Sequence, residues 1–166
     1  MDESGQKPDA NTKRFWCIYK PKLKRKMTHM KINSIGFYSL NGINIIDSPQ
    51  NTKSLNFCNF LHRIRDKNPQ SLICIILDNY SVHKAKMVSK CAQLLGIILV
   101  YLPPYSPDLN PIEYIWKSIK SEISISNIEN TFELKECVEN NFAILSSSSS
   151  YATSWRKNFD VYNWLI

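Results

Sequence analysis

Hydrophobic and polar positions in the first part of the chain follow first a strand period and then a helical one. Apolar, aromatic and β-branched residues predict strands at 13–19, 32–38 and 43–46. Between the last two, Asn41-Gly42 is typical of a hairpin, because both residues tolerate positive φ. From Thr52 to Asp66 apolar residues recur at helical spacing, and Asn68-Pro69 ends that helix. We therefore expect an antiparallel strand pair followed by a helix.

Two unbroken apolar runs follow, with a helical pattern between them. Ser71–Leu77 and Ile97–Tyr101 contain few polar residues, as expected for strands buried on both faces. Val82–Leu95 has helical spacing, and Gly96 is placed to end that helix. Strand, helix and strand in this order predict a parallel βαβ unit.

The C-terminal part reads as two helices and a tail. Apolar residues at helical spacing predict helices over 111–123, with Trp116 in the core, and over 131–145. Ser146–Ser150 is expected to be a linker, and the bulky apolar tail Trp155–Ile166 is expected to dock on the domain. The whole pattern predicts an α/β domain over residues 1–145, a mixed sheet flanked by helices, with linker and docking tail over 146–166.

The composition narrows the class of protein. The 166 residues suffice for one domain with a core, and no apolar run is long enough to span a membrane. The first 13 residues contain no apolar stretch of signal-peptide length. Five cysteines without a CxxC pair argue against a zinc site or a disulfide framework, and Cys74 and Cys91 are expected to be buried in a cytoplasmic protein.

The net charge of +7 is concentrated in one region. From Ala10 to Ile46 there is no acidic residue, and eight basic residues are interleaved with aromatic ones. This segment is either a solvated basic loop or a surface that contacts phosphates. As candidate DNA contacts we take Lys13, Arg14, Lys24, Arg25 and Lys26.

Two acidic residues stand at positions where chemistry is often found. Asp78 follows a buried strand, at the sheet edge where functional groups gather, although such a residue can simply cap the next turn. Glu113 fits a capping box, with Asn110 as N-cap and Pro111 at the first helical position, and could serve only to close the helix. However, four of the eight prolines lie in Pro103–Glu113, and so stiff a loop would deliver Glu113 to a set position.

The sequences around both acids resemble the Tc/mariner superfamily of DDE transposases, and most closely its prokaryotic insertion-sequence type. The resemblance rests on LDNYSVHKA at 77–85 and YLPPYSPDLNPIEYIWK at 101–117. The 34 residues between Asp78 and Glu113 are similar to the superfamily's spacing of its second and third acids. MDESG at 1–5 resembles the segment that carries the first, and Trp16 and Gly36 also match. Covering about Asp2 to Lys120, the resemblance implies an RNase H-like fold.

The resemblance also implies a mechanism. Asp2, Asp78 and Glu113 would be the catalytic residues and would hold two divalent cations, Mg²⁺ or Mn²⁺, which suit hard carboxylate ligands. Water would cleave DNA first, and the released 3′-OH would then attack target DNA. Further candidate DNA contacts are Asn79, His83, Lys117 and Lys120. The first two could instead orient Asp78, and the two lysines could be merely solvated.

The chain departs from this superfamily at its start. With only Met1 before Asp2, the central strand is expected to be truncated, with polar loop from Gly5 to Asn11 and unpaired backbone groups on neighbouring strands. The usual N-terminal helix-turn-helix region is expected to come from an upstream segment or to be missing. The expected partners are transposon-end and target DNA and a second copy in a homodimer, with no membrane, in a prokaryotic nucleoid.

Two other functions stay open at this point. The chain could be a catalytically inactive DNA-binding remnant, or an inhibitor of the full-length enzyme, in which Asp2 would be disordered. It could also be another RNase H-like nuclease, such as a resolvase or a retroviral-type integrase, although the Pro103–Glu113 loop argues against that.

Overall fold

The computed structural model describes residues 1–8, 18–19 and 29–160, with side chains up to residue 156. The strand expected at 13–19 therefore lies outside the described residues, apart from a bend at 18–19. None of the helices in the described ranges is long and apolar enough to cross a membrane. The elements are β1 Asp2–Gln6, β2 Ile32–Phe37, β3 Ile45–Asp47, α1 Ser54–Lys67, β4 Ile73–Leu77, α2 Lys86–Leu94, β5 Ile97–Tyr101, a 3₁₀ turn Pro107–Leu109, α3 Ile112–Ile123, α4 Thr131–Ser146 and α5 Ser150–Asp160.

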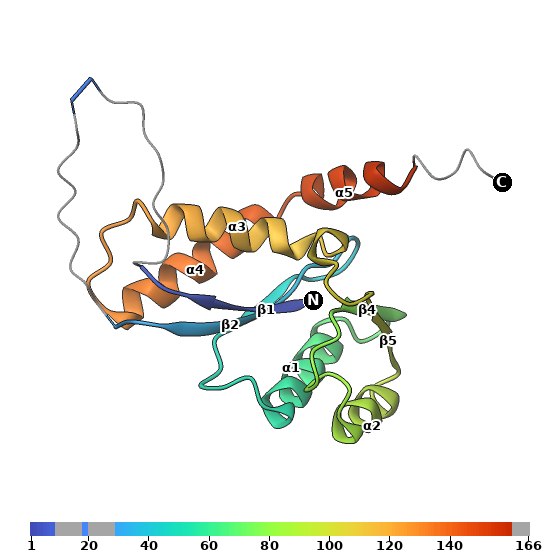
Figure 1. Cartoon of the computed structure of the whole chain (residues 1–166). Coiled ribbons are helices and arrows are strands. Elements are labelled where there is room, and N and C mark those ends of the chain that lie inside the picture. The colour runs from blue at the N-terminus through green and yellow to red at the C-terminus, as the bar shows by residue number, and fades with distance from the viewer. Residues whose placement is uncertain (9–17, 20–28, 161–166) are drawn as a thin grey trace.

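The strands form two sheets that meet at the start of β1. β1 and β3 both pair antiparallel with β2, and β4 pairs parallel with β5, as expected from the strand-helix-strand pattern. The Met1 amino group donates a hydrogen bond to the Ile76 carbonyl over 2.9 Å, which places β1 beside β4. The strand order is β3-β2-β1 in one sheet, and the other sheet, β4-β5, lies beside the N-terminal end of β1 (Figure 1).

β1 contains residues for which the sequence predicted a loop. Asp2–Gln6 pair in full register with β2, from Asp2 opposite Gly36 to Gln6 opposite Ile32, so the loop expected from Gly5 begins only after Gln6, and its residues 9–11 lie outside the described residues. The polar residues form a strand because β2 supplies a continuous partner and helices cover both faces. In the part that the structure describes, β1 forms no ladder of backbone hydrogen bonds with β4, as expected for a truncated central strand.

Helices cover both faces of the β1–β3 sheet. In Figure 1, α3 and α4 lie on one side of this sheet, and α1 and α2 lie on the opposite side. Because side chains alternate along a strand, Ile35 and Phe37 of β2 join the core with α1, whereas Gly36 lies against Trp116 of α3. Trp116 is fully buried, which confirms the prediction that it belongs to the core.

The β4–β5 pair is covered on one face only, so the prediction that both faces are buried was wrong. Ile73, Ile75 and Leu77 lie in the core with α1 and α2. On the other face Cys74, Ile98 and Val100 are exposed. Cys91, in contrast, is buried as expected.

Two connections differ from the predicted ones. The β2–β3 loop spans seven residues, 38–44, and in the described chain only Tyr105 and Gly96 have positive φ, so the turn expected at Asn41-Gly42 does not form. Instead the Asn44 side chain accepts a hydrogen bond from the Ser39 amide, at 2.7 Å. The helix expected from Val82 begins only at Lys86, because 80–85 form consecutive turns.

The serine-rich segment 146–150 forms a shorter connection between α4 and α5 than the predicted linker. Ser146 is buried at the end of α4 and Ser150 begins α5, so only 147–149 connect the two helices. α5 packs back onto the domain: the Trp155 indole donates to the Leu109 carbonyl at 2.9 Å, and Ala152 is buried. The packing places α5 next to the loop that precedes α3.

Candidate active site

Asp2 and Glu113 are brought together by β1 and α3. Asp2 lies opposite Gly36 in the ladder and is only 7% exposed, and Glu113 lies in the first turn of α3. Burial, followed by the negative charge of Glu113, raises the pKa of Asp2 to about 8. A carboxyl next to a second carboxylate holds its proton because two negative charges in a poorly solvated place repel each other. This corner of the fold therefore carries an excess of negative charge.

The start of α3 leaves the Glu113 side chain available to the site. The helix has Pro111 as its N-cap and no side-chain hydrogen bond to the cap, so the predicted capping box is not formed. The Asn110 side chain instead donates to the Met1 carbonyl at 3.3 Å. Only the backbone amide of Glu113 bonds to Asn110, at 3.1 Å from its carbonyl.

Asp78 lies at the end of β4, where its carboxylate is held by the turn that follows. Its Oδ1 accepts a hydrogen bond from the Tyr80 amide at 3.0 Å and lies 2.9 Å from His83 Nδ1. The side chain is 53% exposed. Burial lowers the pKa of the Met1 amino group to about 6, and the charges of Asp2, Glu3 and Asp78 oppose that shift. The Met1 amino group therefore lies within reach of the charges of both Asp2 and Asp78.

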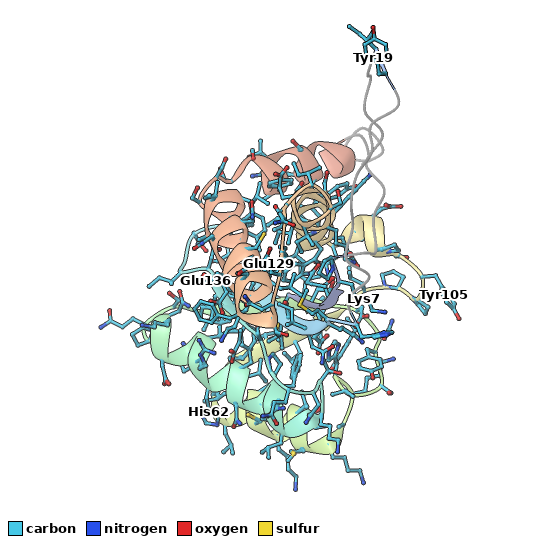
Figure 2. All side chains as sticks on the ribbon, turned by 90° about the vertical axis from the view of Figure 1, so that its left-hand side faces the viewer. Lys7, Tyr19, His62, Tyr105, Glu129 and Glu136 are labelled. Carbon is cyan, nitrogen blue, oxygen red and sulfur yellow. The ribbon has the colours of Figure 1, made fainter. Side chains whose placement is uncertain are left out.

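A cavity of about 550 Å³ opens between the ends of β4 and β5 and the start of α3. Asp78 and Glu113 both line it, together with the proline-rich loop. In that loop Tyr105 has a positive φ of 57° and is fully exposed, and Figure 2 shows it projecting from the edge of the molecule. An exposed aromatic side chain on a sparsely populated backbone conformation is often functional.

The carboxylates fit divalent cations in their chemistry. Carboxylate oxygens are the hard ligands that Mg²⁺ and Mn²⁺ prefer, and a cation would relieve the repulsion between Asp2 and Glu113. In the described ranges, however, no three acidic, histidine or cysteine side chains are close enough to hold one ion. The structure therefore brings Asp2 and Glu113 together, with Asp78 on the same cavity but bound to His83.

The residues predicted to contact DNA have different surroundings. Lys117 of α3 is exposed and Lys120 partly so, whereas the Asn79 amide donates to the Leu102 carbonyl. His83 is only 1% exposed and offers no free face to DNA. Outside the described residues lie Lys13, Arg14, Lys24, Arg25 and Lys26.

Glu3 is a site residue that the sequence analysis missed. Both Oε1 and Oε2 of Glu3 are within 3.1 Å of His83 Nε2. Burial alone would lower the pKa of His83, but the hydrogen bond and charge of Glu3, helped by Asp78, outweigh it and raise the pKa. The signal for Glu3 was its place next to Asp2, which in a strand points it to the opposite face.

Comparisons with known proteins agree with this arrangement. The sequence matches the family described as DDE superfamily endonuclease over residues 1–135. The structure of the Mos1 strand transfer complex is similar with a TM-score of 0.65 at 16% identity, over 93% of this chain and 48% of that one. The Mos1 mariner paired end complex with Mn gives 0.64 at 17%, over 85% and 46%. The catalytic domain of Mos1 mariner transposase gives 0.60 at 18%, over 76% and 66%.

The structural likeness establishes the fold, which is the predicted RNase H-like α/β fold. The chain spans about half the length of the Mos1 chains in those two complexes. A comparison with curated protein sequences finds no match. Because the family match covers 135 of the 166 residues and includes all three acids, the chain belongs to the DDE superfamily endonuclease family.

Proposed function

We propose that this chain is a transposase catalytic domain that cleaves DNA and transfers strands with the help of two divalent cations, Mg²⁺ or Mn²⁺, held by Asp2, Asp78 and Glu113. The observation that carries the proposal is the burial of Asp2 beside Glu113, because two repelling carboxylates need a cation to be ionised together. The ordered, buried position of Asp2 in β1 also argues against an inactive remnant with a disordered N-terminus. The solved neighbours include Mos1 complexes with Mn and with Mg.

The three proposed metal ligands lie partly on a buried side and partly on an open side of the site. When bound, the cations would stabilise the charges on the attacking and leaving oxygens of an in-line displacement. Asp2 forms the buried side, and the half-buried Glu113 and the exposed Asp78 line the cavity that a phosphodiester would enter. Water would attack first and release a 3′-OH, which would attack target DNA in the same cavity without a covalent link to the protein.

The partners follow from the same proposal. Transposon-end and target DNA would bind at the cavity, with Lys117 and Lys120 on the adjoining helix within reach of phosphates. A homodimer, a helix-turn-helix region outside these residues and a place in a prokaryotic cytoplasm, at the nucleoid, stay predictions.

Nicking of supercoiled plasmid in the presence of Mn²⁺ tests the proposal. The native chain should nick, and Asp78→Ala and Glu113→Ala should each lower the rate by more than about 100-fold. Removing a residue that only supports a metal ligand lowers activity by up to about 100-fold, and removing a ligand itself should cost more. Exposed acids on two helices supply matched controls, and Asp66→Ala and Glu136→Ala should nick at the native rate. Equal nicking by Asp78→Ala would contradict the assignment.

The second candidate is a DNA-binding protein without catalytic activity. The observation in its favour is that Asp78 is bound to His83 and does not meet Asp2 and Glu113 closely enough to share one ion. In that case the native chain would not nick, and a gel-shift titration would give the same DNA affinity for the native chain and for Asp78→Ala.

A further inference from the structure

His83 occupies an enclosed position between the two sheets. It lies in the turns that connect β4 to α2, and its ring is almost completely buried. The Phe57 ring of α1 lies 4.5 Å from it, centroid to centroid, and Tyr80 lies edge-on at 5.6 Å. The His83 backbone carbonyl accepts a hydrogen bond from the Tyr101 hydroxyl at 2.9 Å. Contacts from α1 and β5 therefore fix both the ring and its backbone.

Both ring nitrogens of His83 face carboxylates that come from different sheets. Nε2 lies 3.0 Å from Glu3 Oε2 and 3.1 Å from Oε1, and Nδ1 lies 2.9 Å from Asp78 Oδ1. Because an ionised carboxylate can only accept, Nε2 donates a hydrogen bond to Glu3, whereas Nδ1 forms an ion pair with the Asp78 carboxylate and lies 3.5 Å from the Asp78 backbone carbonyl. The charge-assisted hydrogen bond to Glu3 and the ion pair with Asp78 form a continuous bridge from Glu3 in β1 to Asp78 after β4.

The bridge crosses the seam where the backbone is least connected. In the described chain β1 forms no ladder with β4, and the Met1–Ile76 hydrogen bond is at the first residue of the chain. Asp2 lies in one sheet and Asp78 directly follows β4 of the other, so the separation of the two acids depends on the contacts that cross the seam. Glu3 is the neighbour of Asp2 and is 13% exposed on the opposite face of the strand, toward His83.

We propose that Glu3 and His83 are positioning residues that hold Asp78 in place relative to Asp2 across this seam. The inference rests on the proposed metal site, and it assigns to two further residues the geometry of that site. One strand thereby serves the site twice: Asp2 meets Glu113 on the α3 face, and Glu3 holds the Asp78 side through His83. Partners that orient a ligand commonly change metal affinity about 10–100-fold when they are removed.

The test is the affinity for Mn²⁺, followed by the electron paramagnetic resonance signal of the free ion. Glu3→Gln keeps the shape of the side chain and removes its charge, and His83→Ala removes both the hydrogen bond to Glu3 and the ion pair with Asp78. Each should weaken Mn²⁺ binding about 10–100-fold. His83→Asn, whose amide nitrogen can take the place of Nδ1, should recover part of the loss because it still donates to Asp78.

The controls separate a positioning role from a structural one. His62→Ala and Glu136→Gln change exposed residues on α1 and α4, both labelled in Figure 2, and should bind Mn²⁺ as the native chain does. Urea unfolding without metal gives the folded fraction of each variant. If folded Glu3→Gln and His83→Asn bind Mn²⁺ with native affinity, the pair is only structural and the inference is wrong.

Failure of the metal site itself gives a different result. If the native chain binds no Mn²⁺, or if Asp78→Asn binds it equally well, the proposed function fails together with the inference. If binding depends on Asp78 but not on Glu3 or His83, the inference alone fails. Should His83→Ala not fold, Glu3→Gln gives the decisive measurement, because it keeps the buried ring in place.

Discussion

The Asn110 side-chain amide donates a hydrogen bond to the Met1 carbonyl over 3.3 Å, and so ties the start of α3 to the residue before Asp2. Asn110 is buried, and so is Met1. Glu113 follows one helical turn later, so this bond sets the position of Glu113 relative to Asp2. The expected capping role of Asn110 is thereby replaced by a tertiary one.

Asn110→Ala should therefore lower the free energy of unfolding by about 1–3 kcal/mol, because it leaves a buried carbonyl without its donor. Urea unfolding measures the change. Asn140, exposed on α4, is the matched control, and Asn140→Ala should be neutral or slightly stabilising because alanine favours a helix. A native midpoint for Asn110→Ala would show that this bond contributes nothing.

Gly36→Ala, in β2, should also disturb the start of α3. An added Cβ would lie 2.8 Å from Trp116 Cζ2 and 3.0 Å from Ile112 Cδ1, and both side chains are fully buried. Overpacking of this kind costs about 1–3 kcal/mol and would push α3, with Glu113, away from Asp2. We expect a lower urea midpoint and slower nicking.

Gly5→Ala is the control for that substitution. Gly5 lies in β1 on an exposed position, and its Cβ would meet only the flexible end of Lys31, at 3.2 Å from Cε. The lysine can move aside, so stability should stay within about 0.5 kcal/mol of the native chain. Equal effects of the two substitutions would contradict the close approach of α3.

The fold was predictable where hydrophobic periodicity was strong. The helices at 54–67 and 112–123 and the parallel β4–β5 pair follow from local patterns of burial. β1 was not predictable in this way, because Asp2–Gln6 are polar and become a strand only through pairing with β2. Nor could the open face of β4 be foreseen, since apolar side chains alone do not reveal whether a second layer covers them.

The sequence predicted the residues of the candidate site but not the contacts between their side chains. Motif resemblance pointed to Asp2, Asp78 and Glu113, and the structure brings the first and last of these together. The role of Glu3 depends on the alternation of side chains in β1, which the loop-like composition concealed. The ion pair of His83 with Glu3 joins residues 80 positions apart, a separation over which local patterns carry no information.

Asp2 should destabilise the metal-free chain increasingly as the pH rises toward 8. The pKa of Asp2, raised to about 8 by burial and by Glu113, exceeds its ordinary value of 3.8, so the folded chain keeps a proton that the unfolded chain loses. The contribution of Asp2 to the free energy of unfolding therefore falls between about pH 4 and pH 8 and then levels off, whereas the lowered pKa of the Met1 amino group contributes a rise between about pH 6 and pH 8. Asp2→Asn should remove the part of the slope that Asp2 contributes.

Urea unfolding in EDTA from pH 5 to pH 9 measures that slope. Asp2→Asn should gain stability relative to the native chain as the pH increases, with the difference constant above about pH 8. Asp66→Asn, a change at an exposed acid of α1, should follow the native curve. Parallel curves for the native chain and Asp2→Asn would show that Asp2 is ionised over the whole pH range and that burial and Glu113 do not raise its pKa.

Tyr105→Ala should weaken the binding of single-stranded DNA without changing the affinity for Mn²⁺. Tyr105 stands fully exposed beside the cavity, on a loop that prolines hold rigid, and stacking of a base on such a ring contributes about 1–3 kcal/mol, or about 5–150-fold in affinity. Fluorescence anisotropy of a labelled oligonucleotide measures the loss. Tyr105→Phe keeps the ring and should bind almost as the native chain does. Phe132→Ala, at an exposed aromatic residue of α4, should have no effect, and a loss as large as that of Tyr105→Ala would mean that aromatic exposure in general, and not this loop, determines DNA binding.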